Sequence, residues 1–232
     1  MWFLQTGALQ EKGRVLAPDL PGFGSRPPLP HSDCRPEAYA DWVAAWLAEQ
    51  GVGPAAVLGY SMGGTVALLL ALRHPERVRR LTLCCCSPCW GRGARRWLGS
   101  LFAGLGGRPA MEIFQATVAW GCRRLLPPGA QRDEVLDMVA RAHRPTMRCL
   151  YLALIALDLT ASLRRLDLPA HVIGGSGDWL APPSHLRLLA QGLPQGQLHI
   201  IPGARHLLCL SHSTRFTQIL RRSLAEPGPA AG

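Results

Sequence analysis

The sequence predicts an α/β protein: a mostly parallel β-sheet flanked by helices, with a helical cap inserted into it. Short apolar runs alternate with helical patterns in both outer parts of the chain, which is typical of βαβ units. Between Trp90 and about Leu166 the pattern is helical, interrupted by Gly and Pro, and shows no strand signal. The length of 232 residues suits one core with one insertion. We therefore expect an α/β core over 1–88 and 167–232 and a cap over 89–166.

The elements of the core follow in chain order. Apolar runs predict strands over 14–19, 55–60, 78–86, 170–174 and 197–201. Amphipathic patterns predict helices over 36–50, 62–73, 184–193 and 214–225. Gly51 and Pro75 end the first two helices, since neither residue continues a helix well. We expect the Pro-Gly-Ala tail after Glu226 to be frayed.

Arginine dominates the charge, because Lys12 is the only lysine and the net charge is +10. Twelve arginines and five acidic residues lie between Cys89 and Arg165, so +7 of this charge belongs to the predicted cap. A basic surface attracts anionic partners, although a solvated surface or a GC-rich genome also explains many arginines. No nucleic-acid motif accompanies the arginines, and nucleic acid is not an expected partner.

No apolar run approaches the roughly 18 residues that a membrane span needs, and the start lacks the pattern of a secretory signal. We therefore expect a cytoplasmic protein without a membrane partner.

The chain has eight cysteines. Three consecutive ones, Cys84–Cys86, are read as small apolar residues of a buried strand. Cys86 and Cys89 match C-x-x-C, but a redox motif should open a helix, whereas this one follows a strand. No further Cys or His pair has zinc spacing. We expect no metal site, no redox motif and no disulfide framework.

The stretch Gly-Tyr-Ser-Met-Gly-Gly over 59–64 carries the strongest functional signal. It fits G-x-S-x-G directly between a predicted strand and a predicted helix, which is the context that gives this pattern meaning. The turn is so tight that Gly59 and Gly63 are expected to be required, with Ser61 strained and exposed. The alternative is a serine in a phosphate-binding or structural turn. We interpret Ser61 as a nucleophile.

A serine needs a histidine to take its proton and a carboxylate to orient that histidine. Asp178 and His206 each follow a later predicted strand, in the chain order Ser, acid, His. Asp158 and Asp167 precede their strand and should face the wrong end of the sheet. The remaining histidines lie on helices, loops or strand starts. The predicted triad is Ser61, Asp178 and His206.

With these residues the chain resembles the α/β-hydrolase superfamily along essentially its whole length. Residues 19–25 (Asp-Leu-Pro-Gly-Phe-Gly-Ser) and 74–78 (His-Pro-Glu-Arg-Val) look like two of its further turns. Ser-Pro-Cys-Trp over 87–90, Trp-Leu-Gly over 97–99, and Phe114 seven residues before Gly121 resemble the pimeloyl-acyl-carrier-protein methyl ester carboxylesterases.

This nearer resemblance implies a cap segment that lines the acyl channel, and cap arginines that bind an acidic acyl-carrier protein. The implied substrate-binding residues are Trp90, Phe114, Gln115, Ala116, Thr117 and Val118.

The superfamily pattern normally begins with strands that precede 14–19, followed by a His-Gly loop. In the sheet of that family, one of these strands lies between those over 14–19 and 55–60. Roughly thirty residues of that pattern are missing here, so we expect a chain truncated at its N-terminus or a genuine short form. The sheet would then have a gap with unpaired edges. The His-Gly loop supplies one oxyanion donor, and the other is the amide after the nucleophile, that of Met62.

We therefore expect a serine carboxylic-ester hydrolase that works through an acyl-enzyme, without metal or organic cofactor. Its substrate is a small acyl ester, and the nearer resemblance implies a pimeloyl-acyl-carrier-protein methyl ester of biotin biosynthesis. A lactonase, a thioesterase or a C–C hydrolase of the same fold is the alternative, as is a non-catalytic binding protein. Dehalogenases and epoxide hydrolases have Asp where this chain has Ser61. Specificity and oligomeric state stay open.

Overall fold

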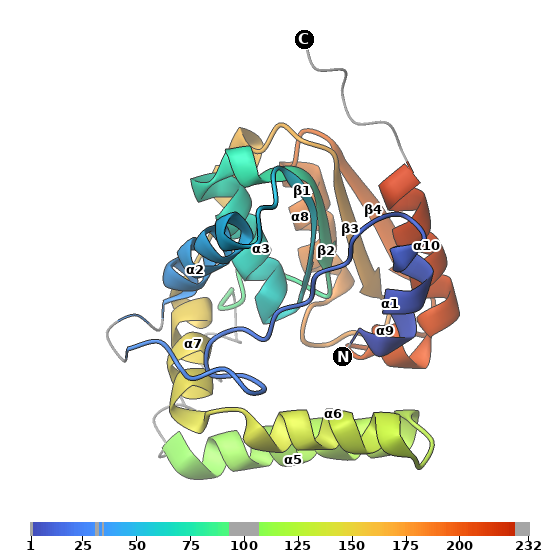
Figure 1. The fold of residues 1–232 in the computed structure, drawn as a ribbon. Helices are drawn as coiled ribbons and strands as arrows, with labels where there is room; N and C mark the ends of the chain where they lie inside the picture. Colours follow the sequence, from blue (N-terminus) through green and yellow to red (C-terminus); the bar gives the residue numbers. More distant parts are fainter. Residues whose placement is uncertain (1, 31–32, 34, 93–106, 226–232) are drawn as a thin grey trace.

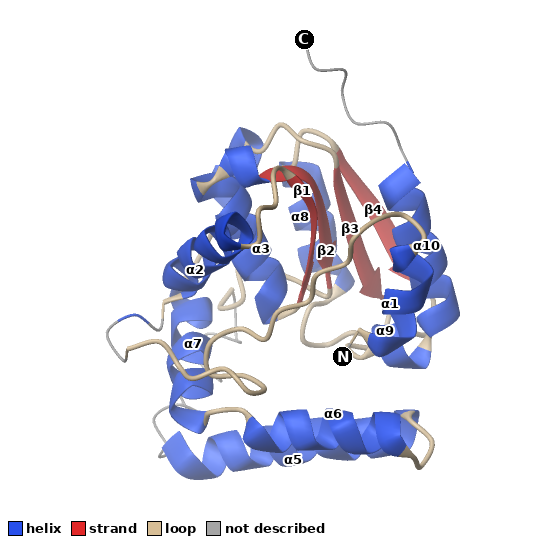
Figure 2. Cartoon of the chain, viewed as in Figure 1, coloured by secondary structure: helices blue, strands red, loops and turns tan. Residues whose placement is uncertain are grey.

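Four parallel strands form the sheet, with helices on both of its faces (Figures 1 and 2). The computed structural model describes residues 2–30, 33, 35–92 and 107–225. In sheet order the strands are β1 (Ala55–Tyr60), β2 (Val78–Cys84), β3 (Ala170–Gly175) and β4 (Gly196–Ile201). Each described strand pairs in parallel with the next.

Two hydrophobic clusters hold the helices against this sheet. The first cluster includes buried residues of α2 (Pro36–Glu49), α3 (Met62–Arg73) and α8 (Pro183–Gly192). The second includes residues of α9 (Leu208–Ser211) and α10 (Ser213–Ala225), with α1 (Phe3–Gln10) packed against them. The predicted α/β class with a parallel sheet is confirmed.

The predicted strand over 14–19 is wrong, since this segment is coil. Its residues 15–18 form a short apolar run, but a strand exists only where a second backbone lies within hydrogen-bonding distance. β1 is at the end of the described sheet, and no strand is paired to its other edge. The Arg14 guanidinium instead donates to the carbonyl of Gln50, at the end of α2.

The strand predicted over 78–86 ends at Cys84. Cys85 has a φ of 46°, in the left-handed region, so the chain leaves the sheet there. The side chains of Cys84, Cys85 and Cys86 are nonetheless fully buried, as expected for small apolar residues. Described cysteines with free thiols are Cys84, Cys85, Cys86, Cys89, Cys122 and Cys209.

The sequence analysis read the cysteines as small apolar residues and expected no disulfide framework, but Cys149 is disulfide-bonded. Cysteine count and compartment signals cannot show which thiols the fold brings together.

The described part of the segment between β2 and β3 is helical and contains no strand. It consists of α5 (Gly107–Leu125), α6 (Ala130–Arg141), α7 (Arg144–Ala156) and the 3₁₀ helix η3 (Thr160–Arg165). In Figure 1, α5 and α6 lie side by side below the sheet, and α7 connects them to the core. Residues 93–106, including the Trp-Leu-Gly motif, lie outside the described residues.

No helix in the described ranges is long and apolar enough to cross a membrane.

Close packing explains two of the glycines around residue 61. A Cβ on Gly59 would lie 2.4 Å from the carbonyl oxygen of Gly63, and one on Gly64 would lie 2.6 Å from the Cβ of Cys86. A Cβ on Gly63, by contrast, would meet nothing within 4 Å. The expectation that Gly63 is required is therefore wrong on steric grounds, and Gly64 is the residue that lets α3 approach Cys86, in the segment after β2.

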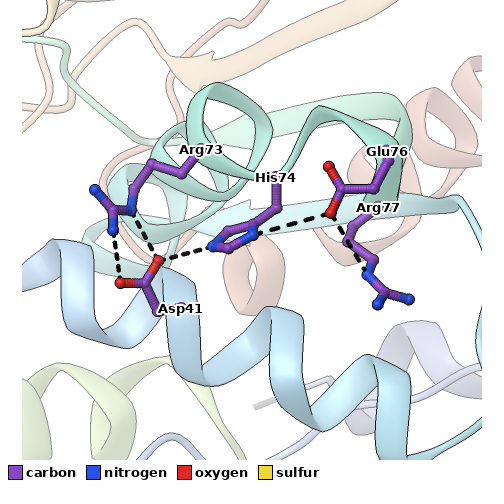
Figure 3. A network of polar contacts seen from close by, with 5 residues as sticks. All are labelled: Asp41, Arg73, His74, Glu76 and Arg77. Carbon is purple, nitrogen blue, oxygen red and sulfur yellow. Dashed lines mark hydrogen bonds and ion pairs between the residues drawn. The ribbon is translucent and has the colours of Figure 1, made fainter.

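An ion-pair network connects α2 to the end of α3 and to η2 (Pro75–Arg77) (Figure 3). The carboxylate of Asp41 accepts hydrogen bonds of 2.8 and 2.7 Å from Arg73 and lies 2.7 Å from Nε2 of His74. His74 Nδ1 and the Arg77 guanidinium in turn lie 3.9 and 3.7 Å from the Glu76 carboxylate. These contacts fix the helix that begins at the 59–64 turn.

We expect Gly64→Ala to lower the free energy of unfolding by about 1–3 kcal/mol, because overpacking forces α3 away from Cys86 in the segment after β2. Gly63→Ala should stay within about 1 kcal/mol of the wild type, since its Cβ enters open space and alanine suits a helix. Urea unfolding of both variants measures the difference. Equal destabilisation by the two alanines would contradict this account of the turn.

We expect Asp41→Asn to lower the free energy of unfolding at pH 7 by at most about 1 kcal/mol, because both partners are more than two-fifths exposed. The hydrogen bond from Arg73 is the largest cause that holds the pKa of Asp41 below its ordinary value of 3.8. The contribution should therefore be complete above that ordinary pKa and be lost as the pH falls through the lower folded-state value. Urea unfolding at several pH values tests this, and a wild-type advantage that grows on acidification would contradict it.

Candidate active site

Ser61 occupies the turn between β1 and α3, at the carboxyl end of the sheet. Its φ of 53° lies in the left-handed region, so the predicted strained conformation is confirmed. The Ser61 N–H donates to the carbonyl of Cys84, which ties the turn to the end of β2 at 2.8 Å. The hydroxyl thus lies at the N-terminus of α3, where the helix dipole favours negative charge.

The fold brings His206 and Asp178 to this serine. Nε2 of His206 lies 3.0 Å from Oγ of Ser61, although 145 residues separate them in the sequence. Nδ1 of His206 lies 2.8 Å from Oδ2 of Asp178. The three side chains therefore form one continuous chain of hydrogen bonds, and each comes from a loop that follows a different strand.

Asp178 is held as a buried carboxylate, with 2% of its surface exposed. Its second oxygen, Oδ1, accepts the amides of Leu180 and Ala181 at 2.9 and 3.0 Å. Burial acts to raise the pKa of Asp178, but the hydrogen bond and charge of His206, together with these amides, outweigh it and lower that pKa. The carboxylate is thus charged at neutral pH and orients the imidazole.

The two competing acids are occupied elsewhere. Asp158 accepts the amide and the hydroxyl of Thr160 at the start of η3. Asp167 accepts the side-chain amide of Gln195 at 2.7 Å.

Met62 is the first residue of α3 and is partly buried. The first amides of a helix have no acceptor within the helix, so its N–H is suited to bind an oxyanion beside Ser61.

A metal-type donor set coincides with these residues. The Cys85 thiol, a carboxylate oxygen of Asp178 and an imidazole nitrogen of His206 lie within 4.8 Å of one another. The acid and the imidazole already bond each other at 2.8 Å, which is closer than two ligands of one metal ion usually lie. The donors therefore suit proton transfer better than metal binding.

The residues expected to bind substrate have different surroundings. Trp90 is partly buried, and its indole N–H donates to the hydroxyl of Thr65 on α3 at 2.9 Å. Val118, on α5, is partly buried and packs against the second cluster. Ala116 and Thr117 are exposed, and the side chain of Phe114 lies outside the described residues.

Gln115 has a structural position within the predicted cap. Its side-chain amide donates to the carbonyls of Val139 and Ala142 at 3.0 and 3.2 Å, and its carbonyl accepts from Arg144 at 2.8 Å. These bonds tie α5 to the end of α6 and the start of α7. Only 7% of Gln115 is exposed, so its polar atoms serve the packing of these helices.

The sequence analysis missed two residues that contact His206 or Asp178. Tyr60 donates its hydroxyl hydrogen to the backbone carbonyl of His206, and the Cys85 thiol lies beside Asp178. Position gives a usable signal for both, because each residue stands at the carboxyl end of a strand next to the nucleophile.

Comparisons with known proteins find several hydrolases to which this chain is similar. A pimeloyl-[acyl-carrier protein] methyl ester esterase from Aeromonas hydrophila is 32% identical, over 95% of this chain and 88% of its own length. A 2-hydroxymuconate semialdehyde hydrolase from Pseudomonas sp. (strain CF600) is 28% identical, over 99% and 83%. A thermophilic esterase from Thermogutta terrifontis superposes with a TM-score of 0.81 at 27% identity, over 96% and 84%.

Both resemblances noted in the sequence are therefore confirmed as similarities. A profile of the alpha/beta hydrolase fold matches residues 4–213, which is most of the chain. This chain belongs to the alpha/beta hydrolase fold family.

Proposed function

We propose that this protein is a serine carboxylic-ester hydrolase with Ser61, His206 and Asp178 as its catalytic triad. The hydrogen-bonded chain from Ser61 through His206 to the buried Asp178, at 3.0 and 2.8 Å, carries the proposal. The similarity to named esterases supports the same reaction.

In the first half of the reaction, Oγ of Ser61 attacks the ester carbonyl carbon while Nε2 of His206 takes the hydroxyl proton. The carbonyl oxygen becomes an oxyanion beside the Met62 N–H. Collapse of the intermediate breaks the ester C–O bond, and His206 returns the proton to the departing alcohol. The acyl group remains on Ser61.

In the second half, His206 takes a proton from water as the hydroxide attacks the acyl-enzyme carbonyl. The bond to Oγ of Ser61 then breaks, the serine regains its proton from His206, and a carboxylic acid leaves. Asp178 keeps the imidazole oriented throughout and stabilises it while it is protonated.

The substrate class follows from the similarity and the charge. The Aeromonas relative is named for a methyl ester carried on an acyl-carrier protein. We therefore propose a carrier-bound acyl methyl ester for this chain, delivered to a basic cap over 89–166 inserted in a core over 1–88 and 167–232. Two arginines at the end of α5, Arg123 and Arg124, are exposed, and Arg124 lies over the 60% exposed ring of Trp120.

A substrate panel distinguishes the alternative activities. Lactones, thioesters and the C–C bonds of semialdehydes use the same triad chemistry. The highest kcat/KM among a methyl ester, a lactone, a thioester and a semialdehyde identifies the class, and a preference for any of the last three would overturn the ester assignment.

We expect Ser61→Ala and His206→Ala each to lower kcat for a p-nitrophenyl ester by roughly 10⁴-fold or more, because the two residues act as one unit. Asp178→Asn should cost roughly 10³–10⁴-fold, since it leaves the imidazole in the wrong tautomer. Steady-state kinetics measure these losses, and thermal unfolding verifies that each variant is folded.

Asp158→Asn is the matched control, and it should leave kcat within about twofold. Equal losses for the two asparagine variants would refute Asp178 as the acid. A folded wild-type chain whose Ser61 a fluorophosphonate does not label would favour a non-catalytic binding protein.

We expect the double variant Arg123→Glu/Arg124→Glu to raise KM for a carrier-bound methyl ester by roughly tenfold, because like charges then repel the acidic carrier. Turnover of a small neutral ester should not change. Raised salt should mimic the substitutions, since exposed charges are screened beyond roughly 8 Å at physiological ionic strength.

The matched control is Arg215→Glu/Arg222→Glu, which makes the same charge change at two exposed positions on α10. The same rise in KM for both double variants would mean that overall charge, and no carrier site on α5, governs the effect.

A further inference from the structure

Tyr60 is a buried residue at the end of β1, directly before the nucleophile Ser61. It is 7% exposed, and its hydroxyl donates to the backbone carbonyl of His206. Its ring also meets the His206 imidazole edge-on, with centroids 6.0 Å apart and planes at 72°. One side chain therefore contacts both the backbone and the ring of the histidine.

Aromatic packing fixes the orientation of this tyrosine. Phe216, which is fully buried on α10, meets the Tyr60 ring at 6.4 Å and 86°. Trp2 meets it at 5.8 Å and 74° from the side of α1. Because three aromatic neighbours surround the ring, the hydroxyl has a fixed direction, toward the His206 carbonyl.

Cys85 lies next to the acid Asp178, as Tyr60 lies next to the histidine. Its left-handed φ of 46° is a conformation that is unfavourable for a non-glycine residue and that clusters at functional sites. Its thiol lies within 4.8 Å of both the Asp178 carboxylate and the His206 imidazole, with no surface exposed. Burial raises the pKa of this thiol, so it is neutral and adds no charge beside Asp178.

We propose that Tyr60 and Cys85 are positioning residues of the triad: Tyr60 holds the backbone of His206, and Cys85 fills the space behind Asp178. Neither residue reaches the substrate. The proposal rests on the proposed ester hydrolysis and extends it to residues that keep the imidazole in line between its two partners.

The physical reason is the steep dependence of proton transfer on geometry. A displacement of about 1 Å can cost roughly a hundredfold in rate. The loop before His206 has one further side-chain tie among the described residues, the amide of Gly203 donating to the hydroxyl of Ser176 at 2.9 Å. Without the Tyr60 hydroxyl, the carbonyl of His206 loses its donor, and the imidazole gains freedom relative to Ser61.

Tyr60→Phe tests the first half, because it removes the hydroxyl and keeps the ring. We expect kcat for a p-nitrophenyl ester to fall roughly 10- to 100-fold, with KM unchanged within about twofold. Tyr39→Phe is the matched control: Tyr39 is buried like Tyr60, and its hydroxyl also donates to a backbone carbonyl, that of Pro21, at 3.1 Å. The control should lose a similar few degrees of melting temperature and keep its kcat.

Cys85→Ala and Cys85→Ser test the second half. Alanine leaves a gap behind the carboxylate and should lower kcat roughly tenfold, whereas serine nearly fills the space and should restore kcat to within about threefold. Wild-type kcat in both Tyr60→Phe and Cys85→Ala would overturn the proposal. Equal losses of kcat in Tyr60→Phe and Tyr39→Phe would also overturn it, since the effect would then be one of general stability.

A proton NMR readout separates this proposal from the proposed function. The downfield resonance of the His206 Nδ1–H bonded to Asp178 should be sharp in the wild type and in Tyr39→Phe, and broadened in Tyr60→Phe. A wild type that shows this pattern but hydrolyses no ester would refute the function and leave the positioning role supported. An unchanged resonance in Tyr60→Phe would refute the positioning role.

Discussion

Parallel pairing of the four strands is the constraint on which the rest of the molecule depends. Because parallel strands end at the same edge, the loops after β1, β3 and β4 meet there, and they supply the serine, the acid and the histidine. Residues 145 positions apart thereby come within hydrogen-bonding distance. The helices of both clusters stabilise this edge indirectly, by covering the two faces of the sheet.

The meeting of Ser61, Asp178 and His206 was predictable because each of the three residues has a local signal in the sequence. Ser61 has its glycines and its strand–helix context, and Asp178 and His206 each follow an apolar run. The segment over 14–19 has a similar apolar pattern, but pairing depends on a neighbouring backbone that the segment's own residues do not encode. Gln115 shows the same limit, since its bonds to α6 and α7 depend on how three helices meet.

The contacts of Tyr60 and Cys85 with His206 and Asp178 were harder to predict from the sequence. Tyr60 and Cys85 read as ordinary apolar residues of buried strands, and both are indeed buried. What distinguishes them is direction: a tyrosine hydroxyl that points at one carbonyl, and a cysteine turned out of its strand by a left-handed backbone. Such directions follow from tertiary packing, and Gly64 differs from Gly63 for the same reason.

The second hydrophobic cluster connects the helices after β2 to the segment that follows His206. It joins Cys122 of α5 and Leu126, the residue after α5, to Leu208 and Cys209 of α9, and Leu207, next to His206, packs against it. A local opening that lifted α5 away would remove part of this cluster from the segment that follows His206. The packing of the α5–α6 hairpin and the local stability of that segment are therefore thermodynamically coupled.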